Sequence, residues 1–590
     1  EMRVASLSAP RQALLLDYLL TLSGDTNDFT FDGATTYHVS GTVNLSGLTT
    51  FEGGAVIKYS PGASLNLLPG SSVRFNGRPY LPVVFTARDD DSVGVTVNGS
   101  SGTPSGYYAN PALGFQGSAA VLSVNLAHFR MAFAQVGVSA SAVSLSVNLS
   151  DGQWVDCQTG IQVPGQGTVS LRNLLLARFQ TALSLAYANA SAQNVTFDGL
   201  PPAPPGYLPS CLLMPAGDPG TMNLSLVNCI LANLGAFCPA RPAAVTASHT
   251  GFYNNGEAAF GSAPVSTLSP PFETQGAGWY YLAPGSGFQN AGTLEVDNAL
   301  LQTLRRGTTA RPPAWSNLTV ASALTLAPAV ARDTDAPDLG YHYPPLDLLV
   351  TGPVTVTNAS LALTNGVVVG GGDGTWFLLR AGVPVSSIGS ATAPDRFTDY
   401  RTVQEQPVKL GPLPNSTGFA LNAHRAGGAA APATLRFTRF TRLAAAGSGY
   451  DLYAGSEWRY SALAVRDCGF AGGQVCLNQD AVPVTLANNL FVNTIGWVGG
   501  QQALDFFNNT VHGPWWEFEC YTRPGWDIRD NLFVDCGVGE FGDEPVNHHH
   551  NGYVNCSTSY YTALGSTDQV LGSLAFATGP LGDYYLPEGS

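Results

Sequence analysis

The sequence predicts an all-β fold, a right-handed parallel β-helix of two tandem modules with a short N-terminal capping helix. Three observations support this fold class. Asparagine recurs at nearly fixed spacing in short apolar stretches, β-branched and aromatic residues alternate there with polar ones, and Gly, Asn, Asp or Pro interrupts each run. Alternating runs of this kind favour strands over helices. A fixed repeat of short β-type runs is typical of a solenoid with stacked coils.

The asparagine spacing sets the expected register of the coils. In the second half the series, at steps of 21, 20 and 22 residues, is Cys468, Asn489, Asn509 and Asn531. In the first half it is Asn125, Asn148, Asn173, Asn194, Asn228 and His249. Coils of a β-solenoid lie about 4.8 Å apart, so a residue kept in phase stacks on its own copies. Asparagine tolerates the left-handed backbone of a tight corner, and its amide can bond to the next amide of a ladder.

A duplicated motif, G-x-Y-Y-L-x-x-G-S, divides the chain at Gly278–Ser286 and Gly582–Ser590. We therefore expect an N-terminal helix and cap at 1–24, a first module at 25–300, a linker at 301–340 and a second module at 341–590. Within the linker, Arg305–Ala331 is rich in Thr, Ala and Pro, which predicts an extended bridge.

The N-terminal helix is expected over Ser8–Leu22. Ser8 can cap it, Pro10 fits its first turn, and its leucines form an apolar face. A helix there would cover the end of the solenoid, whose open strand edges otherwise pair with other chains. Docking of this helix on a neighbouring subunit is the alternative.

Composition narrows the function classes. Charged residues make up 11% of the 590 residues and the net charge is −15, so no basic stripe exists and nucleic acid is a poor partner. No run approaches the roughly 18 apolar residues of a transmembrane helix. The chain starts without a signal peptide, as expected of a mature product or an excised fragment.

The nine cysteines form no CxxC pair, which leaves zinc ribbons and thioredoxin-type sites unsupported. Three pairs are about a loop or a coil apart and have spacings that allow bridging: Cys229–Cys238, Cys468–Cys476 and Cys520–Cys536. Such bridges favour export to an oxidising, extracellular environment.

Several phrases resemble large secreted bacterial proteins with parallel β-helix repeats, most of them uncharacterised. The phrases are FEGGAVIKY, PVVFTARDDDSVG, RDTDAPDLGYHYPPLD and YYLPEGS, and the resemblance spans most of residues 25–590. It implies export and a β-helical fold. It supplies no catalytic residues.

Two acidic tracts are candidates for binding a cation. Asp333, Asp335 and Asp338 place carboxylates at nearly alternate positions of a junction loop, and hard oxygen ligands suit calcium. The loop lacks the Gly and distal Glu of an EF-hand, so a plain Asx-turn is the alternative. Asp89–Asp91 is similar and has Arg88 available for pairing. The tract Asn547–Asn551 (NHHHN) is a further metal candidate, but adjacent residues of a strand point to opposite sides. Only His548 and His550 could share a face, and a solvated or stacked coil corner is favoured.

Trp515–Trp526 (WWEFECYTRPGW) is the richest functional candidate. On a strand, Trp516 and Phe518 share one face while Glu517 and Glu519 share the other. Aromatic rings beside carboxylates resemble a sugar-binding surface, and paired carboxylates at a suitable separation can hydrolyse glycosides. Aromatics that fill or cover a widened coil are the alternative. The carbohydrate-contact candidates are Trp515, Trp516, Glu517, Glu519 and Trp526.

The sequence favours a structural role over catalysis. No G-x-S-x-G elbow, H-E-x-x-H motif or phosphate loop is present, and no cluster of Asp with Arg or Lys on adjacent coils is legible. We expect a secreted, cell-surface subunit of a layer or fibre, without a required cofactor other than the calcium considered above. Unlike ends of solenoids can join head to tail into an open filament. The alternatives are a polysaccharide lyase or glycoside hydrolase, and a carbohydrate-binding adhesin.

Overall fold

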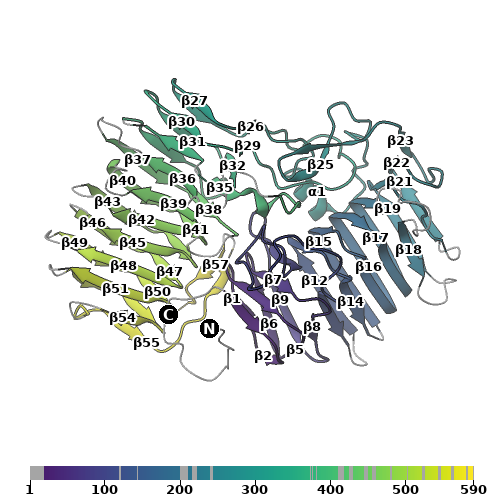
Figure 1. The fold of residues 1–590 in the computed structure, drawn as a ribbon, viewed down its shortest axis with the longest axis horizontal. Helices are drawn as coiled ribbons and strands as arrows, with labels where there is room; N and C mark the ends of the chain where they lie inside the picture. Colours follow the sequence, from purple (N-terminus) through teal and green to yellow (C-terminus); the bar gives the residue numbers. More distant parts are fainter. Residues whose placement is uncertain are drawn as a thin grey trace.

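Two parallel β-helices make up the protein, which confirms the predicted fold class. The computed structural model describes residues 19–588 except 118–120, 143, 200–209, 216–221, 240–243, 373, 375, 381, 409–417, 424–429, 444–448, 455–459, 479–481, 501–502, 521–524, 543–545, 560–563 and 580–581. In Figure 1 the two stacks of strands stand side by side, the first running from purple to blue and the second from green to yellow.

The first β-helix has three faces. The facing sheet, which packs on the second β-helix, contains β1 (Leu19–Leu22), β4 (Thr36–Val39), β7 (Val56–Tyr59), β10 (Val83–Ala87), β13 (Phe129–Ala132), the ends of β15 (Ser144–Val155), β16 (Thr159–Phe179) and β17 (Thr181–Gly199), β20 (Ile230–Ala232), β22 (Gly251–Tyr253) and β23 (Val265–Thr267). A second face contains β2 (Thr26–Asn27), β5 (Thr42–Ser46), β8 (Ser64–Leu67), β11 (Leu113–Gln116), β14 (Val136–Ser141), the starts of β16 and β17, and β18 (Cys211–Pro215). The third contains β3 (Thr30–Phe31), β6 (Leu48–Glu52), β9 (Ser72–Asn76), β12 (Val121–Ala127), the remaining parts of the long strands, β19 (Asn223–Val227) and β21 (Ala244–Ser248).

The second β-helix has three separate parallel sheets, named F, G and H here. Sheet F contains β26 (Ala314–Trp315), β29 (Leu348–Val350), β32 (Val368–Gly371), β35 (Asp395–Asp399), β38 (Thr438–Thr441), β41 (Gly469–Ala471), β44 (Leu490–Val492), β47 (Thr510–His512), β50 (Leu532–Val534), β53 (Gly552–Val554) and β55 (Gln569–Leu571). Sheet G contains β27 (Leu318–Val320), β30 (Val354–Val356), β33 (Phe377–Leu379), β36 (Gly418–Ala423), β39 (Gly449–Ala454), β42 (Gln474–Asn478), β45 (Ile495–Gly499), β48 (Trp515–Cys520), β51 (Gly537–Gly542) and β54 (Ser557–Ser559). Sheet H contains β28 (Leu324–Leu326), β31 (Leu361–Thr364), β34 (Val385–Ile388), β37 (Ala431–Arg436), β40 (Tyr460–Arg466), β43 (Pro483–Ala487), β46 (Ala503–Phe507), β49 (Trp526–Arg529) and β52 (Asn547–His549).

Two boundaries differ from the sequence expectations. Leu19–Leu22, the end of the predicted N-terminal helix, is strand β1 and pairs in parallel with β4, because this apolar run extends the facing sheet by one strand. Residues 1–18 lie outside the described part. The predicted linker contains the first coil of the second β-helix, since β26, β27 and β28 pair with β29, β30 and β31. The short helix α1 (Asn298–Leu304), capped by Asp297, precedes that coil.

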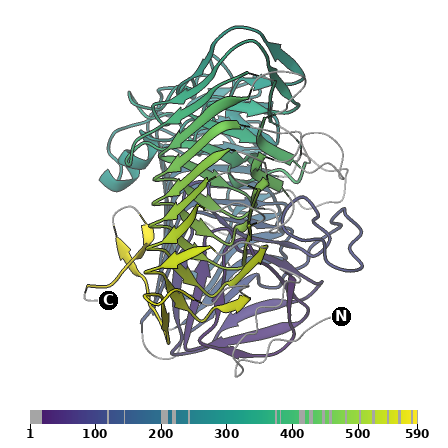
Figure 2. The same cartoon turned by 90° about the vertical axis from the view of Figure 1, so that its left-hand side faces the viewer.

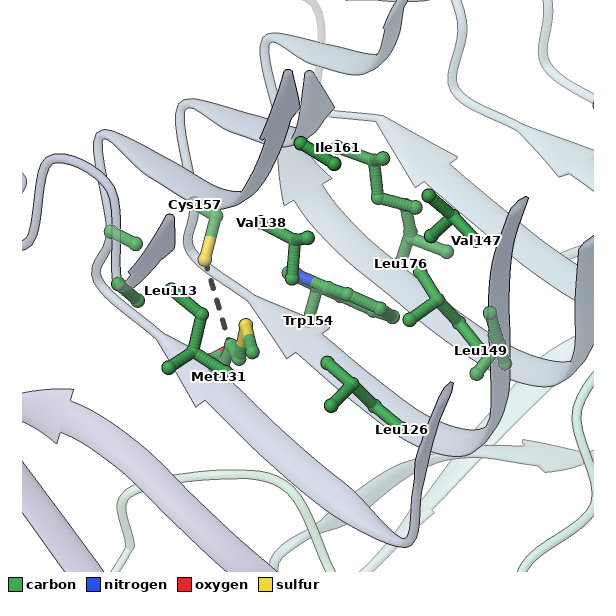
Figure 3. Packing of buried hydrophobic residues seen from close by; sticks show 14 of the residues in the cluster. Leu113, Leu126, Met131, Val138, Val147, Leu149, Trp154, Cys157, Ile161 and Leu176 are labelled. Carbon is green, nitrogen blue, oxygen red and sulfur yellow. Dashed lines mark hydrogen bonds between the residues drawn. The ribbon is translucent and has the colours of Figure 1, made fainter. Parts of the chain in front are cut away.

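Ladders of identical residues fill the cores. In the second β-helix, Phe397, Phe440, Phe470 and Phe491 stack with ring centroids 4.8–5.1 Å apart, one ring per coil. In the first, Trp154 packs among branched apolar residues, and the Cys157 thiol donates to the Met131 carbonyl (Figure 3). Continuous burial of this kind explains how a long chain with few charges holds a single repetitive fold.

The asparagine ladder of the second half is confirmed. Asn489 donates to Asn509, Asn509 to Asn531 and Asn531 to Asn551, with distances of 3.0–3.1 Å. In the first half four predicted positions, Asn173, Asn194, Asn228 and His249, are confirmed, and the register is wrong by three residues at Asn125 and Asn148. Asn148 stacks on Asn125 within strands and is exposed, whereas Asn173 belongs to a corner ladder with left-handed backbone. That ladder comprises His128, Asp151, Asn173, Asn194, Asn228 and His249.

The duplicated motif forms the same element twice. In the first copy, β25 (Gly278–Leu282) pairs antiparallel with β24 (Phe272–Gln275). In the second copy, β57 (Gly582–Tyr585) pairs antiparallel with β56 (Ala577–Gly579). In Figure 1 β57 lies between the two stacks and β25 lies beside α1, and Figure 2 shows the second hairpin beside the last coils.

The seam between the β-helices is a packed interface of apolar and polar residues. Its apolar part includes Tyr80, Tyr281, Tyr343 and Tyr400 in one buried cluster. Its polar part includes the hydrogen bond from Tyr80 to the Pro345 carbonyl at 2.9 Å. These contacts fix the two β-helices against each other. Among the described residues, no helix has the length and apolar character needed to cross a bilayer.

Candidate functional site

Strand β48 has the alternation expected from its sequence. Trp516 and Phe518 point into the core of the second β-helix and are fully buried. Glu517 and Glu519 lie on the outer face of sheet G and are half-buried, as is Trp515. The prediction that the aromatic pair and the carboxylate pair occupy opposite faces is confirmed.

Two of the predicted carbohydrate-contact residues are core residues instead. Trp516 is 0% exposed and Trp526 is 2% exposed. The Trp516 ring packs 4.6 Å from Phe491, and its indole N–H donates to the Thr494 carbonyl at 3.2 Å. Neither ring reaches the surface, because each occupies an inward position of its strand. They fill coils, which is the alternative considered from the sequence.

Aromatic residues on neighbouring coils extend the surface around Trp515. Strand pairing aligns Trp497 with Glu517, and Glu519 with Phe541, along the outer face of sheet G. Trp497 and Phe541 are both 39% exposed, which is unusual for such large rings. The sequence analysis missed both; the alternation of Ile495–Gly499, one coil before β48, would have placed Trp497 outward. These five residues, Trp497, Trp515, Glu517, Glu519 and Phe541, are called the aromatic face below.

Glycines allow the Trp515 ring to lie flat on the sheet. A Cβ at Gly537 would lie 2.2 Å from Trp515 Cε3, and one at Gly539 would lie 2.7 Å from Trp515 Cζ2. Real Cβ atoms do not approach so closely, so both positions need glycine. The result is a broad apolar ring surface bordered by carboxylates.

The two carboxylates of the aromatic face are electrostatically linked. Burial raises the pKa of Glu517 above its ordinary value; a hydrogen bond from the Trp515 indole N–H opposes this rise, and the neighbouring Glu519 carboxyl group adds to it.

The aspartates proposed as calcium ligands have protein partners. Asp333 Oδ2 lies 2.6 Å from His342 Nε2, and it also accepts from the Asp338 backbone N–H. Asp338 in turn accepts from Thr309 and from the backbone N–H of Asn290. Asp333 and Asp338 are buried, while Asp335 is exposed. These bonds tie the junction loop together, and the calcium site stays a prediction. In the described part of the chain, no three His, Cys, Asp or Glu side chains are grouped to hold a metal ion.

The histidine tract is divided between the core and the surface. His548 is buried with its Nε2 3.0 Å from Glu540 Oε2, whereas His550 lies at an exposed corner with positive φ. His548 and His550 therefore do not share a face. Asn551 continues the buried asparagine ladder, which agrees with the coil-corner interpretation.

The three cysteine pairs that the spacing allows are not formed among the described side chains. Cys229, Cys468 and Cys476 are free thiols, so neither Cys229–Cys238 nor Cys468–Cys476 is bridged. Strand pairing aligns Cys520 with Gly542 and not with Cys536. The thiols of Cys536 and Cys556 lie on successive coils, with their sulfur atoms 3.6 Å apart.

A second polar site lies in the seam, where the sequence analysis found no cluster. The facing sheet places Arg130 next to Gln153 on its outer side, and Gln153 donates to the Val403 carbonyl of the second β-helix at 2.8 Å. Lys58, two coils earlier, donates to the Asp90 carbonyl. Strand alternation alone puts these side chains outward. Their partners across the seam are up to 250 residues away in sequence, so no local pattern announces them.

No protein-family model matches the chain, and no curated protein matches it. Among solved structures it is similar to the PL6 family alginate lyase AlyGC, with a TM-score of 0.15 and 10% identity over 94% of this chain and 97% of that one. A mutant of that enzyme gives a TM-score of 0.14 and 9% identity over the same shares. Likeness at this level carries no argument about activity, and the fold assignment rests on the strand pairing itself.

Proposed function

We propose that the protein is an extracellular carbohydrate-binding β-solenoid that holds a polysaccharide chain along the aromatic face of sheet G. The observation that carries the proposal is the pair of outward tryptophans, Trp497 and Trp515, on successive coils beside two carboxylates. The apolar C–H face of a sugar ring packs on an indole ring, and carboxylate oxygens accept hydrogen bonds from sugar hydroxyls.

The dimensions suit an extended ligand. Phe541 lies two coils beyond Trp497, so the aromatic rings span about 10 Å along the axis at about 4.8 Å per coil. Strands β45, β48 and β51 contain no Lys or Arg, while Glu517 and Glu519 contribute negative charge. We therefore expect neutral polysaccharides to bind and polyanionic ones to be repelled.

The test is a binding screen against neutral and acidic polysaccharides by isothermal titration calorimetry. Trp515→Ala and Trp497→Ala should each weaken binding by about tenfold or more, because they remove exposed rings that carry contact area. Trp279→Ala is the matched control: Trp279 is 41% exposed but lies on β25, away from the aromatic face. Binding that is equally weakened by all three substitutions, or by none, would overturn the proposal.

Binding without turnover separates this function from the enzyme alternative. If the aromatic face only binds, the bound polysaccharide should keep its chain length. Robust cleavage lost in Glu517→Gln or Glu519→Gln would instead establish a lyase or hydrolase.

A second candidate, a subunit of a surface layer or fibre, is favoured by the apolar C-terminal end. Val570 is 73% exposed, Leu586 is 57% exposed and Tyr585 is 40% exposed, and unlike solenoid ends that meet can propagate. Electron microscopy of the intact chain should show filaments. Removal of residues 1–18, which leaves strand β1 in place, should abolish them if the N-terminal segment makes the contact. A strictly monomeric intact chain at high concentration would exclude this role.

A further inference from the structure

Arg130 is a buried cation with unused hydrogen-bond donors. It lies on β13 of the facing sheet and is 5% exposed. Its Nε donates to Gln153 Oε1 at 2.9 Å. Its two terminal amino groups make no hydrogen bond or ion pair with any described residue. A guanidinium carries five N–H donors, so most of its capacity is unused.

These donors border a small pocket at the seam. The pocket lies between the facing sheet and the segment after the short 3-10 helix Tyr400–Thr402, and its polar lining residues are Asp90, Ser92, Arg130, Glu405 and Gln406. Its empty volume, including the solvent at its mouth, is about 280 Å³. Because this figure counts the open solvent, the enclosed space is far below the range of about 300–1,000 Å³ for small-molecule sites, so a polysaccharide chain does not fit.

The carboxylates of the pocket are engaged by other donors. Asp90 accepts from Thr86 through Oδ2 and from both the backbone and side chain of Ser92 through Oδ1. Glu405 Oε1 accepts from the backbone N–H of Trp279 and from the Gln406 side chain. Its Oε2 accepts from the Tyr343 hydroxyl. Neither carboxylate is within ion-pair contact of Arg130.

A buried guanidinium without a contacting anion is costly, because the charge has lost its hydration shell. Burial lowers the pKa of Arg130 below its usual range, and the negative charges of Glu405 and Asp90 and the tyrosines Tyr341 and Tyr343 only partly offset that fall. Asp90 and Glu405 act on the guanidinium from a distance, and no described acceptor contacts its terminal amino groups. An anion in direct contact with the guanidinium would supply that acceptor.

We propose that the seam pocket binds a small monovalent anion, a carboxylate or a halide, on the terminal amino groups of Arg130. The anion accepts hydrogen bonds from the donors that the protein leaves unused. Because Arg130 belongs to the first β-helix and Glu405 and Gln406 to the second, the anion also joins the two β-helices. This site is independent of the aromatic face on sheet G.

The first experiment is a crystal structure of the intact protein grown with sodium bromide. Anomalous scattering should place a bromide within hydrogen-bond distance of the Arg130 terminal nitrogens. A parallel crystal with sodium formate tests the carboxylate, which can accept both terminal amino groups at once. Water alone at this position under both conditions would overturn the proposal.

The second experiment measures thermal unfolding at constant ionic strength. Formate and bromide should each raise the unfolding midpoint, and the rise should level off at high anion concentration, as expected for a ligand that binds only the folded state. A bulky organic sulfonate, which cannot enter the pocket, is the reference and should give no such rise. Arg130→Gln should lose this response, whereas Arg74→Gln, which changes an exposed arginine of β9, should keep it. A response that persists in Arg130→Gln would show that the anions act elsewhere. If Arg130→Gln does not fold, the bromide crystal of the unchanged protein decides.

Discussion

The outer face of sheet G and the outer face of the facing sheet are built by the same alternation of side chains, yet only one is open. On sheet G, Trp497 and Trp515 point outward and keep contact with solvent. On the facing sheet, Arg130 and Gln153 also point outward but are buried by the second β-helix. In a double solenoid, outward from one core does not mean exposed. The fold therefore leaves one surface open to solvent and uses the other to join its halves.

The adjacent tryptophans of β48 provide the strongest test of this comparison. Trp516→Ala removes a fully buried ring that contacts Phe491 and Phe506, and we expect a loss of about 3–5 kcal/mol in the free energy of unfolding. Trp515→Ala removes an outer ring and should cost well under half as much. Chemical denaturation of both variants measures the difference. Similar losses would mean that β48 does not have the described orientation.

The buried asparagine ladder should give the next largest effect. Asn509 donates to the Leu486 carbonyl and to Asn531, and its own oxygen accepts from Asn489. Asn509→Ala leaves several of these groups unsatisfied at about 1–3 kcal/mol each, so we expect a loss of about 2–4 kcal/mol.

The control is Asn148→Ala in the exposed strand ladder, which should change stability by no more than about 0.5 kcal/mol. Equal losses of stability at the two ladders would show that burial does not determine how much an asparagine stack contributes to the free energy of unfolding.

These two ladders also show how far sequence predicts this structure. Period and alternation gave the fold, the second asparagine register and the two faces of β48, because each depends on residues one or two coils apart. The first register failed at Asn125 and Asn148, because strand and corner residues share the same period, three residues apart, as Asn148 and Asp151 do. The seam could not be predicted, since Gln153 and Val403 are 250 residues apart in sequence and no local pattern links them.

The two glycines that lie under the Trp515 ring, Gly537 and Gly539, give a prediction for binding alone. Gly537→Ala places a methyl group 2.2 Å from the Trp515 ring, so the ring must leave the sheet surface. We expect polysaccharide affinity to fall about tenfold, or about 1.4 kcal/mol, with stability nearly unchanged. Gly41→Ala, where a Cβ meets nothing within 4 Å, is the control for both measurements. Unchanged affinity in Gly537→Ala would mean that the flat ring is not the binding surface.

The smallest expected effect is a pH dependence of the seam at its C-terminal end. Burial raises the pKa of Glu52 above 4.5, and Asp32 adds to this rise. Burial lowers the pKa of His512, but Asp535, Glu52 and Asp32 outweigh it and leave the pKa raised above 6.5. Two further groups face this cluster: Arg78, which follows β9, and Tyr584 of the second hairpin.

Both shifts have the same sign for stability. A group whose folded pKa is raised stabilises the folded state below its unfolded pKa, and this contribution disappears as pH rises through the folded value. The free energy of unfolding should therefore fall modestly between pH 6 and pH 8, the window in which His512 loses its proton. His512→Gln should flatten that slope, whereas His249→Gln, at a corner of the first β-helix, should not. If the free energy of unfolding still falls with pH in His512→Gln, or if it rises with pH in the unchanged protein, this cluster is not the cause of the pH dependence.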